Sequence, residues 1–131
     1  MSKTKEDLIN FRMNKGAEAF ELAGFSLSKS FWSSAASELY YTCFYYVQAV
    51  FAKYDIVAST HTGLISLFGL HFIKENKIDL KWGKLLRNLY DKRMKGDYGD
   101  FMVLTEKEIM PLVAEVEEFV SILKDIIKDR N

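Results

Sequence analysis

Hydrophobic positions recur with the three- to four-residue spacing of an α-helix along nearly the whole chain, and no segment alternates in the manner of a β-strand. The pattern predicts five helices, at about residues 4–23, 31–54, 63–75, 80–95 and 106–128. Short polar or glycine-containing links separate them. Five helices joined in this way predict an all-α fold, an up-and-down four-helix bundle with a short extra helix.

Capping residues mark the expected ends of these helices. The expected starts are, in chain order, Ser2 or Thr4, then Ser30, Thr60 or Thr62, Asp79, and Thr105 in a capping box with Glu108. The expected stops are Gly24 after the first helix, and Gly96 and Gly99 after the fourth. Pro111 lies too deep in the last helix to be harmless, so we expect a kink there or a separate turn over residues 106–110.

The segment at residues 31–54 is apolar on all sides. Glu38 is its only charge before Lys53, and aromatic side chains surround it at Tyr40, Tyr41, Phe44, Tyr45, Tyr46 and Phe51. A helix that is apolar all round is buried all round. We therefore expect it at the centre of the domain, with neighbouring helices or a second copy of the protein covering its aromatic surface.

The amino-acid composition excludes several classes of protein and of binding site. A length of 131 residues, 49% of them apolar, is enough for one domain over residues 1–131 with a real core. Eighteen basic residues balance eighteen acidic ones, which excludes bulk-charge binding of nucleic acid or membrane. Cys43 is the only cysteine, so an internal disulfide and a cysteine zinc site are excluded. Without a signal region or spanning segment, we expect a soluble protein in a reducing cytoplasm.

Charge is unevenly distributed in spite of this balance. Residues 77–98 carry seven basic and three acidic side chains, whereas residues 99–131 carry four basic and eight acidic ones. One interpretation is two solvated faces of adjacent helices that attract each other. The other is a local basic groove on the fourth helix that holds a phosphate-bearing ligand.

Three segments, in order, resemble the HEPN domain family. They are ASELYYTCFYYVQAVF at residues 36–51, STHTGLISLFGLHFIKEN at residues 59–76 and LYDKRMKGDYGD at residues 89–100. The resemblance covers about residues 8–123 and fits the branch with a THxG turn and an R-x-x-x-D-Y segment. It implies a four-helix bundle with a short extra helix that usually forms homodimers. It also implies binding of a nucleotide or RNA, often in toxins or defence effectors that are paired with a minimal nucleotidyltransferase.

Many members of that family are metal-independent ribonucleases whose motif is an arginine followed, after four to six residues, by a histidine. Arg93 matches the arginine, which suits the stabilisation of charge on a phosphorane. The histidine, best placed for proton transfer near pH 7, is absent, since the corresponding positions are Tyr98, Gly99 and Asp100.

Each candidate residue has a functional and a structural interpretation. Arg93 faces a phosphate, or forms an ion pair with Asp97 four residues later. Alternatively, Asp97 accepts hydrogen bonds from backbone N–H groups and so fixes the following loop. Tyr98 replaces the missing histidine, or packs with a satisfied hydroxyl. His61 is a substitute catalytic histidine, or only begins a helix, and His71 is expected to be a core or interface residue.

Two hypotheses of different class follow. The first is a homodimeric nucleotide- or RNA-binding module that acts with a nucleotidyltransferase partner in a toxin–antitoxin or defence pair, with binding residues Arg93, Arg87, Lys92 and Lys95. The second is a metal-independent endoribonuclease toxin whose arginine motif departs from the family pattern. Its catalytic candidates are Arg93, Asp97, Tyr98 and His61. No metal, cofactor, membrane or DNA partner is expected. A purely structural helical dimer is the third alternative.

Overall fold

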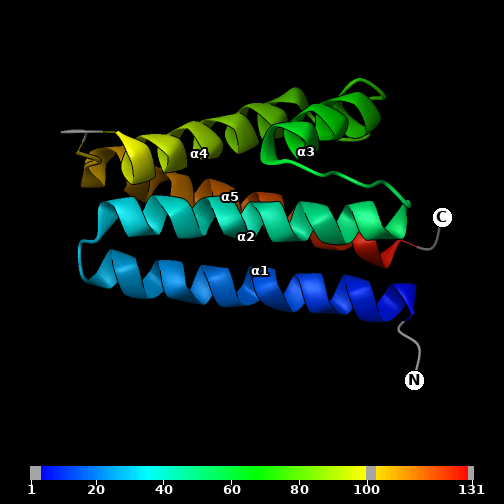
Figure 1. Cartoon of the computed structure of the whole chain (residues 1–131), viewed down its shortest axis with the longest axis horizontal. Coiled ribbons are helices and arrows are strands. Elements are labelled where there is room, and N and C mark those ends of the chain that lie inside the picture. The colour runs from blue at the N-terminus through cyan, green and yellow to red at the C-terminus, as the bar shows by residue number, and fades with distance from the viewer. Residues whose placement is uncertain (1–3, 100–102, 130–131) are drawn as a thin grey trace.

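The computed structural model describes residues 4–99 and 103–129, and consists of helices joined by short links (Figure 1). In chain order they are α1 (Lys5–Ser28), α2 (Trp32–Lys53), α3 (His61–Phe68), the π-helical segment η1 (Gly69–Ile73), α4 (Leu80–Tyr98) and α5 (Glu106–Lys128). The described residues contain no β-strand, which confirms the all-α prediction. None of the described helices is long and apolar enough to cross a membrane.

Helix α2 runs through the middle of the molecule. Helix α1 packs antiparallel along one side of α2, whereas α4 and α5 pack on its other sides, and α3 with η1 lies on α4 (Figure 1). The long helices α1, α2, α4 and α5 form the expected up-and-down bundle. The continuous unit of α3 and η1 is the short extra helix.

The core is built on α2, as its unbroken apolar pattern predicts. Twelve of the 22 residues of α2 are buried, which no other helix approaches. The helices around α2 also pack on one another through large aromatic side chains. Trp82 of α4 stacks on Phe119 of α5 with ring centroids 5.4 Å apart, and Phe119 also meets Phe68 of α3 edge to face at 5.7 Å. Burial of these side chains supplies the main stabilising term of the fold.

The expected junction between the first two helices is wrong at Gly24 and at Ser30. Gly24 lies inside α1, which continues to Ser28 because Ala23 and Ser26 are buried against the bundle. Ser30 does not cap α2; it adopts a left-handed conformation with φ of 59° and closes the end of α1. The Phe31 N–H donates to the Ser26 carbonyl at 2.9 Å across this turn.

The remaining boundaries are partly confirmed. Thr60 and Asp79 cap α3 and α4, and Thr105 forms the expected capping box with Glu108. Gly96 does not end α4, which continues to Tyr98 with Gly99 as its C-cap. The expected separate turn over residues 106–110 is absent, because α5 is one helix through Pro111. Ile109 and Leu112, on either side of the proline, are buried, so tertiary packing offsets the lost backbone hydrogen bond.

Candidate functional site around Arg93

Five rings from three helices gather where α2 meets the start of α3 and the middle of α4. The His61 ring lies among the others, with its centroid 4.7 Å from that of Phe44, 5.6 Å from Tyr40, 5.9 Å from Tyr41 and 6.2 Å from Tyr90. We call these five residues the aromatic cluster. Its members on α2, at spacings of one and four residues, belong to the helix face that the sequence already shows to be aromatic.

The THxG turn places His61 in this cluster. Thr60 is the N-cap of α3, and its hydroxyl accepts a hydrogen bond from the Gly63 N–H at 2.9 Å. A Cβ atom at position 63 would lie 2.7 Å from that hydroxyl oxygen, so glycine permits the close cap. His61 is thereby the first residue of α3, and its Nδ1 lies 2.8 Å from the Tyr40 hydroxyl. The histidine is therefore fixed by the fold, beyond a merely local role at a helix start.

Arg93 reaches the aromatic cluster from α4. Its guanidinium carbon lies 5.0 Å from the ring centroid of Tyr41 and 5.9 Å from that of Tyr40, within the range of cation–π contacts. Its Nε lies 3.4 Å from Oδ2 of Asp97, so the expected i, i+4 ion pair is present. The contact lacks hydrogen-bond geometry, however, and Nε is buried without a hydrogen-bond partner among the described residues. The protein itself thus satisfies this arginine only in part.

Burial and this cation set the protonation of the neighbouring groups. Desolvation lowers the pKa of His61 from its ordinary value, and the positive charge of Arg93 lowers it further. Burial raises the pKa of Tyr40 far above its ordinary range, although Arg93 opposes that shift. Near neutral pH the site therefore holds a permanent cation beside a neutral imidazole and a neutral phenol. The hydrogen bond between Tyr40 and Nδ1 leaves Nε2 of His61 as the ring nitrogen for a ligand.

Asp97 and Tyr98 line an open groove next to Arg93. The groove has a volume of about 630 Å³ and lies between the end of α4 and the first turns of α2, which contribute Ser33, Ser34, Ser37 and Glu38. The Tyr98 side chain is not a packing residue, because it is 67% exposed. N–H groups at the start of α2 point toward its N-terminal end, where the N-cap Phe31 makes no side-chain cap. The groove combines serine hydroxyls and the positive end of a helix with the carboxylates of Glu38 and Asp97.

Of the other predicted binding residues on α4, Arg87 also contacts the aromatic cluster, because its guanidinium carbon lies 6.0 Å from the Tyr90 ring centroid. The ammonium groups of Lys92 and Lys95 lie 3.3 Å and 3.9 Å from Oε1 of Glu108, at the start of α5. Hydrogen bonds from Thr105 and Lys92 hold the pKa of Glu108 below its ordinary value. Arg87 is largely exposed and lies 3.7 Å from Asp91. Lys92 and Lys95 therefore fit the first interpretation of the uneven charge, in which a basic helix face attracts an acidic one. No contact found among the described residues places either lysine in the aromatic cluster.

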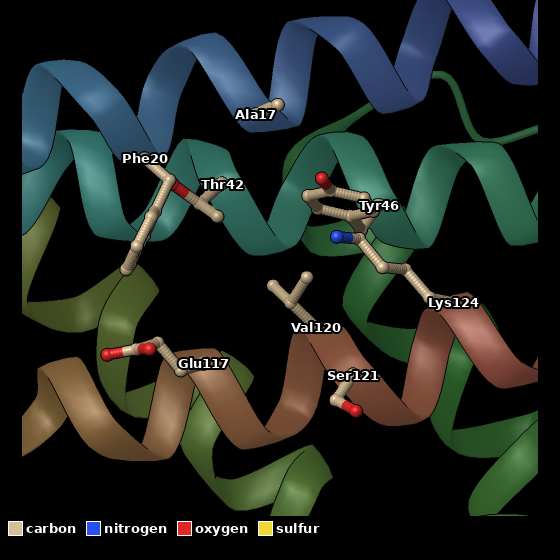
Figure 2. A pocket seen from close by; sticks show the side chains of 8 residues that line it. All are labelled: Ala17, Phe20, Thr42, Tyr46, Glu117, Val120, Ser121 and Lys124. Carbon is tan, nitrogen blue, oxygen red and sulfur yellow. The ribbon is translucent and has the colours of Figure 1, made fainter.

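A second, smaller cavity of about 320 Å³ lies between α1, α2 and α5 (Figure 2). Phe20, Tyr46 and Val120 supply much of its apolar lining, and the Lys124 side chain extends toward Tyr46. The Lys124 Nζ lies 5.6 Å from the Tyr46 ring centroid. No sequence motif points to this cavity, and its combination of apolar and charged lining residues indicates no particular ligand.

The structure adds functional candidates that motif reasoning missed. Tyr40, Tyr41 and Tyr90 contact His61 or Arg93, and only the spatial arrangement reveals them. Within residues 4–99 and 103–129, no three His, Cys, Asp or Glu side chains gather closely enough to hold a metal ion. Asp100, the third position where the motif histidine was expected, lies outside the described residues.

Comparison with known proteins identifies relatives along nearly the whole chain. A family model described as "HEPN domain" matches residues 9–126. A "UPF0332 protein" of Thermotoga maritima is 26% identical over 125 residues, which cover 95% of both chains. A Methanocaldococcus jannaschii protein named "Putative toxin MJ0605" is 28% identical over 129 residues, 98% of this chain and 96% of its own. A second protein of that organism, "Putative toxin MJ0142", is 26% identical over 125 residues, 91% of this chain and 85% of its own.

Proposed function

Because the chain belongs to the HEPN domain family, we propose that it is a homodimeric nucleotide- or RNA-binding module of a toxin–antitoxin or defence pair. Two of its relatives carry the word toxin in their names, which supports this setting. A nucleotidyltransferase partner is part of the proposal on the strength of the family resemblance alone.

The state of Arg93 is the observation that carries the proposal. Its guanidinium lies against two tyrosine rings, its Nε has no hydrogen-bond partner among the described residues, and Asp97 faces it only at 3.4 Å. Arginine pairs with two phosphate oxygens at once and stays charged. The nearby tyrosine rings provide surfaces on which a base can stack. Because Nε itself is buried, the terminal N–H groups of the Arg93 guanidinium are the donors that we expect a phosphate ligand to contact.

Binding of a labelled single-stranded RNA oligonucleotide and of ATP tests the proposal, by fluorescence anisotropy and by calorimetry. We expect Arg93→Ala to weaken binding at least about ten-fold, the effect of one lost charge-assisted contact. Lys84→Ala is the control, because it removes one positive charge from an exposed position on the same helix that is not among the predicted binding residues. Equal losses in the two variants, or binding of neither probe by the unaltered protein, would overturn the proposal.

A metal-independent ribonuclease is the second candidate, and the place of His61 favours it. The motif histidine is missing, yet the fold brings His61 within reach of the charge of Arg93 and bonds it to Tyr40. When Nδ1 carries the ring proton and donates it to the Tyr40 hydroxyl oxygen, the neutral Nε2 is an acceptor and suits removal of the 2′-hydroxyl proton. Arg93 suits stabilisation of the phosphorane charge. His61 is therefore a stronger catalytic candidate than Tyr98, since imidazole is the side chain best suited to proton transfer near neutral pH.

RNA cleavage in the presence of EDTA separates the two candidates. For a ribonuclease we expect activity in the unaltered protein and loss of about a hundred-fold or more in both Arg93→Ala and His61→Ala. His71→Ala is the control, since it removes the other histidine, on η1. The same background in all four proteins would eliminate catalysis and leave the binding module. Cleavage that survives His61→Ala would assign the proton transfer to another group.

A further inference from the structure

Tyr40 holds its hydroxyl group in the interior of the molecule, against His61. The Tyr40 side chain is fully buried, and its hydroxyl has one hydrogen-bond partner in the described part of the chain, Nδ1 of His61 at 2.8 Å. Burial raises the pKa of this phenol far above its ordinary range, so the hydroxyl keeps its hydrogen near neutral pH. A buried hydroxyl that donates to nothing carries the cost of its lost hydrogen bonds to water. Nδ1 is therefore the atom to which Tyr40 donates.

This hydrogen bond selects one of the two neutral forms of the His61 ring. A neutral imidazole carries its hydrogen on one nitrogen and accepts a hydrogen bond with the other. If Nδ1 carried the hydrogen, the ring would donate to the Tyr40 oxygen, and the phenol hydrogen would stay buried without an acceptor. The cost of that orphaned donor corresponds to a preference of roughly five- to 150-fold for the other form. The hydrogen of the neutral ring therefore lies on Nε2.

No other described group competes for the His61 ring. Among the described residues, neither ring nitrogen makes a second hydrogen bond, and the charge of Arg93 acts on the ring without a hydrogen bond to it. Nε2 does not belong to the polar atoms that are buried without a partner, so solvent and ligands reach it. His61 therefore has an accessible Nε2–H group within the field of the Arg93 cation.

We infer that Tyr40 is a positioning residue, which makes His61 a hydrogen-bond donor toward the ligand of the Arg93 site. The Nε2–H group of His61 and the terminal N–H groups of Arg93 are then donors alone. The chemical group that matches them is one that only accepts, such as a phosphoryl oxygen. A ribose hydroxyl that donates its hydrogen finds no acceptor on the accessible side of the His61 ring. The ligand named here rests on the proposed function, whereas the form of the His61 ring belongs to the free protein.

The same arrangement opposes base catalysis by His61 in the unaltered chain. Removal of the proton from a 2′-hydroxyl needs a bare ring nitrogen that the ligand can reach. With the hydrogen on Nε2, the bare nitrogen is Nδ1, and the buried Tyr40 hydroxyl occupies it. His61 in this form binds a phosphate oxygen and takes no proton from the ligand. RNA cleavage that is lost in His61→Gln, which keeps a donor but is no base, would therefore contradict the inference.

Nitrogen-15 NMR of the histidine rings in the free protein tests the role of Tyr40. The spectra are recorded at about pH 8, well above the ordinary histidine pKa, where protonated and bare ring nitrogens give separate signals. We expect a protonated Nε2 and a bare Nδ1 in His61. In Tyr40→Phe the Nδ1 signal should move to the position of a bare nitrogen without a hydrogen bond, while the signals of His71 stay in place. A hydrogen on Nδ1, or an Nδ1 signal that Tyr40→Phe leaves unchanged, would overturn the inference.

A pair of His61 variants of similar length tests the donor itself. His61→Gln retains an N–H donor at a comparable reach, whereas His61→Met has none. We expect ATP and the labelled RNA to bind His61→Gln within about three-fold of the unaltered chain, and His61→Met about ten-fold more weakly, the effect of one lost hydrogen bond to a charged group. Circular dichroism checks that both variants are folded. Equal binding by His61→Met and the unaltered chain would exclude His61 as a donor to the ligand.

These measurements separate this inference from the proposed function. A chain with its hydrogen on Nε2 that binds neither ATP nor RNA would overturn the proposed function and the ligand named here, and would leave the control of His61 by Tyr40. Binding of either probe through Arg93, in a chain whose His61 hydrogen lies on Nδ1, would overturn this inference and leave the proposed function.

Discussion

Helix α4 contains the same local pattern twice, and the two copies have different surroundings. Arg87 precedes Asp91 by four residues, and Arg93 precedes Asp97 by four. The first pair is more than half exposed on both sides, whereas the Arg93 side chain is 13% exposed and lies against Tyr40 and Tyr41. Both arginines also have an aromatic neighbour, since Arg87 lies 6.0 Å from the Tyr90 ring centroid. Local sequence therefore does not distinguish them, and tertiary packing does.

Arg87 therefore belongs to a solvated ion pair, whereas Arg93 is a largely buried cation. Water screens Arg87 and Asp91, so their attraction contributes little to stability. Arg93 has lost most of its water and has gained rings and one carboxylate at 3.4 Å in return. A group that is held in this incompletely satisfied state is typical of a functional site, where stability is given up for binding.

Removal of the Tyr40 ring, which packs against the Arg93 guanidinium, should have the largest effect on stability. Tyr40 is fully buried, so we expect Tyr40→Ala to lower the free energy of unfolding by about 3–5 kcal/mol, as for other buried aromatic residues. Tyr40→Phe, which keeps the ring and loses only the hydrogen bond to His61, should cost about 1 kcal/mol. Urea denaturation followed by circular dichroism measures both. A loss of unfolding free energy below about 1 kcal/mol in Tyr40→Ala would mean that the Tyr40 ring does not hold Arg93 in place.

Replacement of each arginine by methionine compares the two copies directly. Arg93→Met keeps an unbranched stem against the rings and removes a buried donor without a partner, while the one-third-exposed Asp97 stays hydrated. We expect the free energy of unfolding to rise by about 1 kcal/mol. Arg87→Met should change it by less than about 0.5 kcal/mol. Destabilisation of Arg93→Met beyond that of Arg87→Met, in the same urea titration, would show that Arg93 is structural.

The pKa of His61 provides a second comparison of Arg93 with Arg87. Because the pKa of His61 is lowered in the folded chain, the unfolded chain binds more protons as pH falls. Stability is therefore fully present above the ordinary histidine pKa of about 6.5 and declines as pH falls from there through the folded pKa. Arg93→Met should move the pKa of His61 upward, and Arg87→Met should not.

Proton NMR titration of the two imidazoles measures this shift, with His71 as the internal reference. An unchanged His61 titration in Arg93→Met would contradict the electrostatic link between the two residues. Urea titrations at several pH values complete the test, since His61→Gln should remove the corresponding part of the pH dependence of stability.

Sequence reasoning was sufficient for the architecture and insufficient for several helix ends. The uninterrupted apolar pattern of α2 predicts its central position, because only a central helix is buried on all sides. Gly24 and Gly96 were expected to end helices, but both lie inside them, since burial of neighbouring residues decides whether a helix continues. Conversely, Ser30 takes the left-handed turn that glycine more commonly occupies.

The candidate site was predictable only in part, for a similar reason. The resemblance singled out Arg93, and helical spacing predicted its ion pair with Asp97. The contact of His61 with Tyr40 joins residues 21 positions apart, so no local pattern could establish it. The sequence predicts Lys92 as a binding residue together with Arg93, but adjacent positions on a helix point about 100° apart. Packing of α5 then determines which of these side chains meets Glu108.

The smallest expected effect concerns the coupling within each ion pair, measured by double-mutant cycles. For Arg87 and Asp91 we expect a coupling of about 0.3 kcal/mol or less, which should disappear in 1 M salt because exposed charges are screened. The coupling of Arg93 with Asp97 should be larger and should persist in salt, since low exposure keeps ions away from it. Unfolding of each single and double alanine variant at low and high salt gives both values. Equal couplings with equal salt dependence would mean that the aromatic surroundings of Arg93 have no electrostatic consequence, and the two copies of the pattern would then be equivalent.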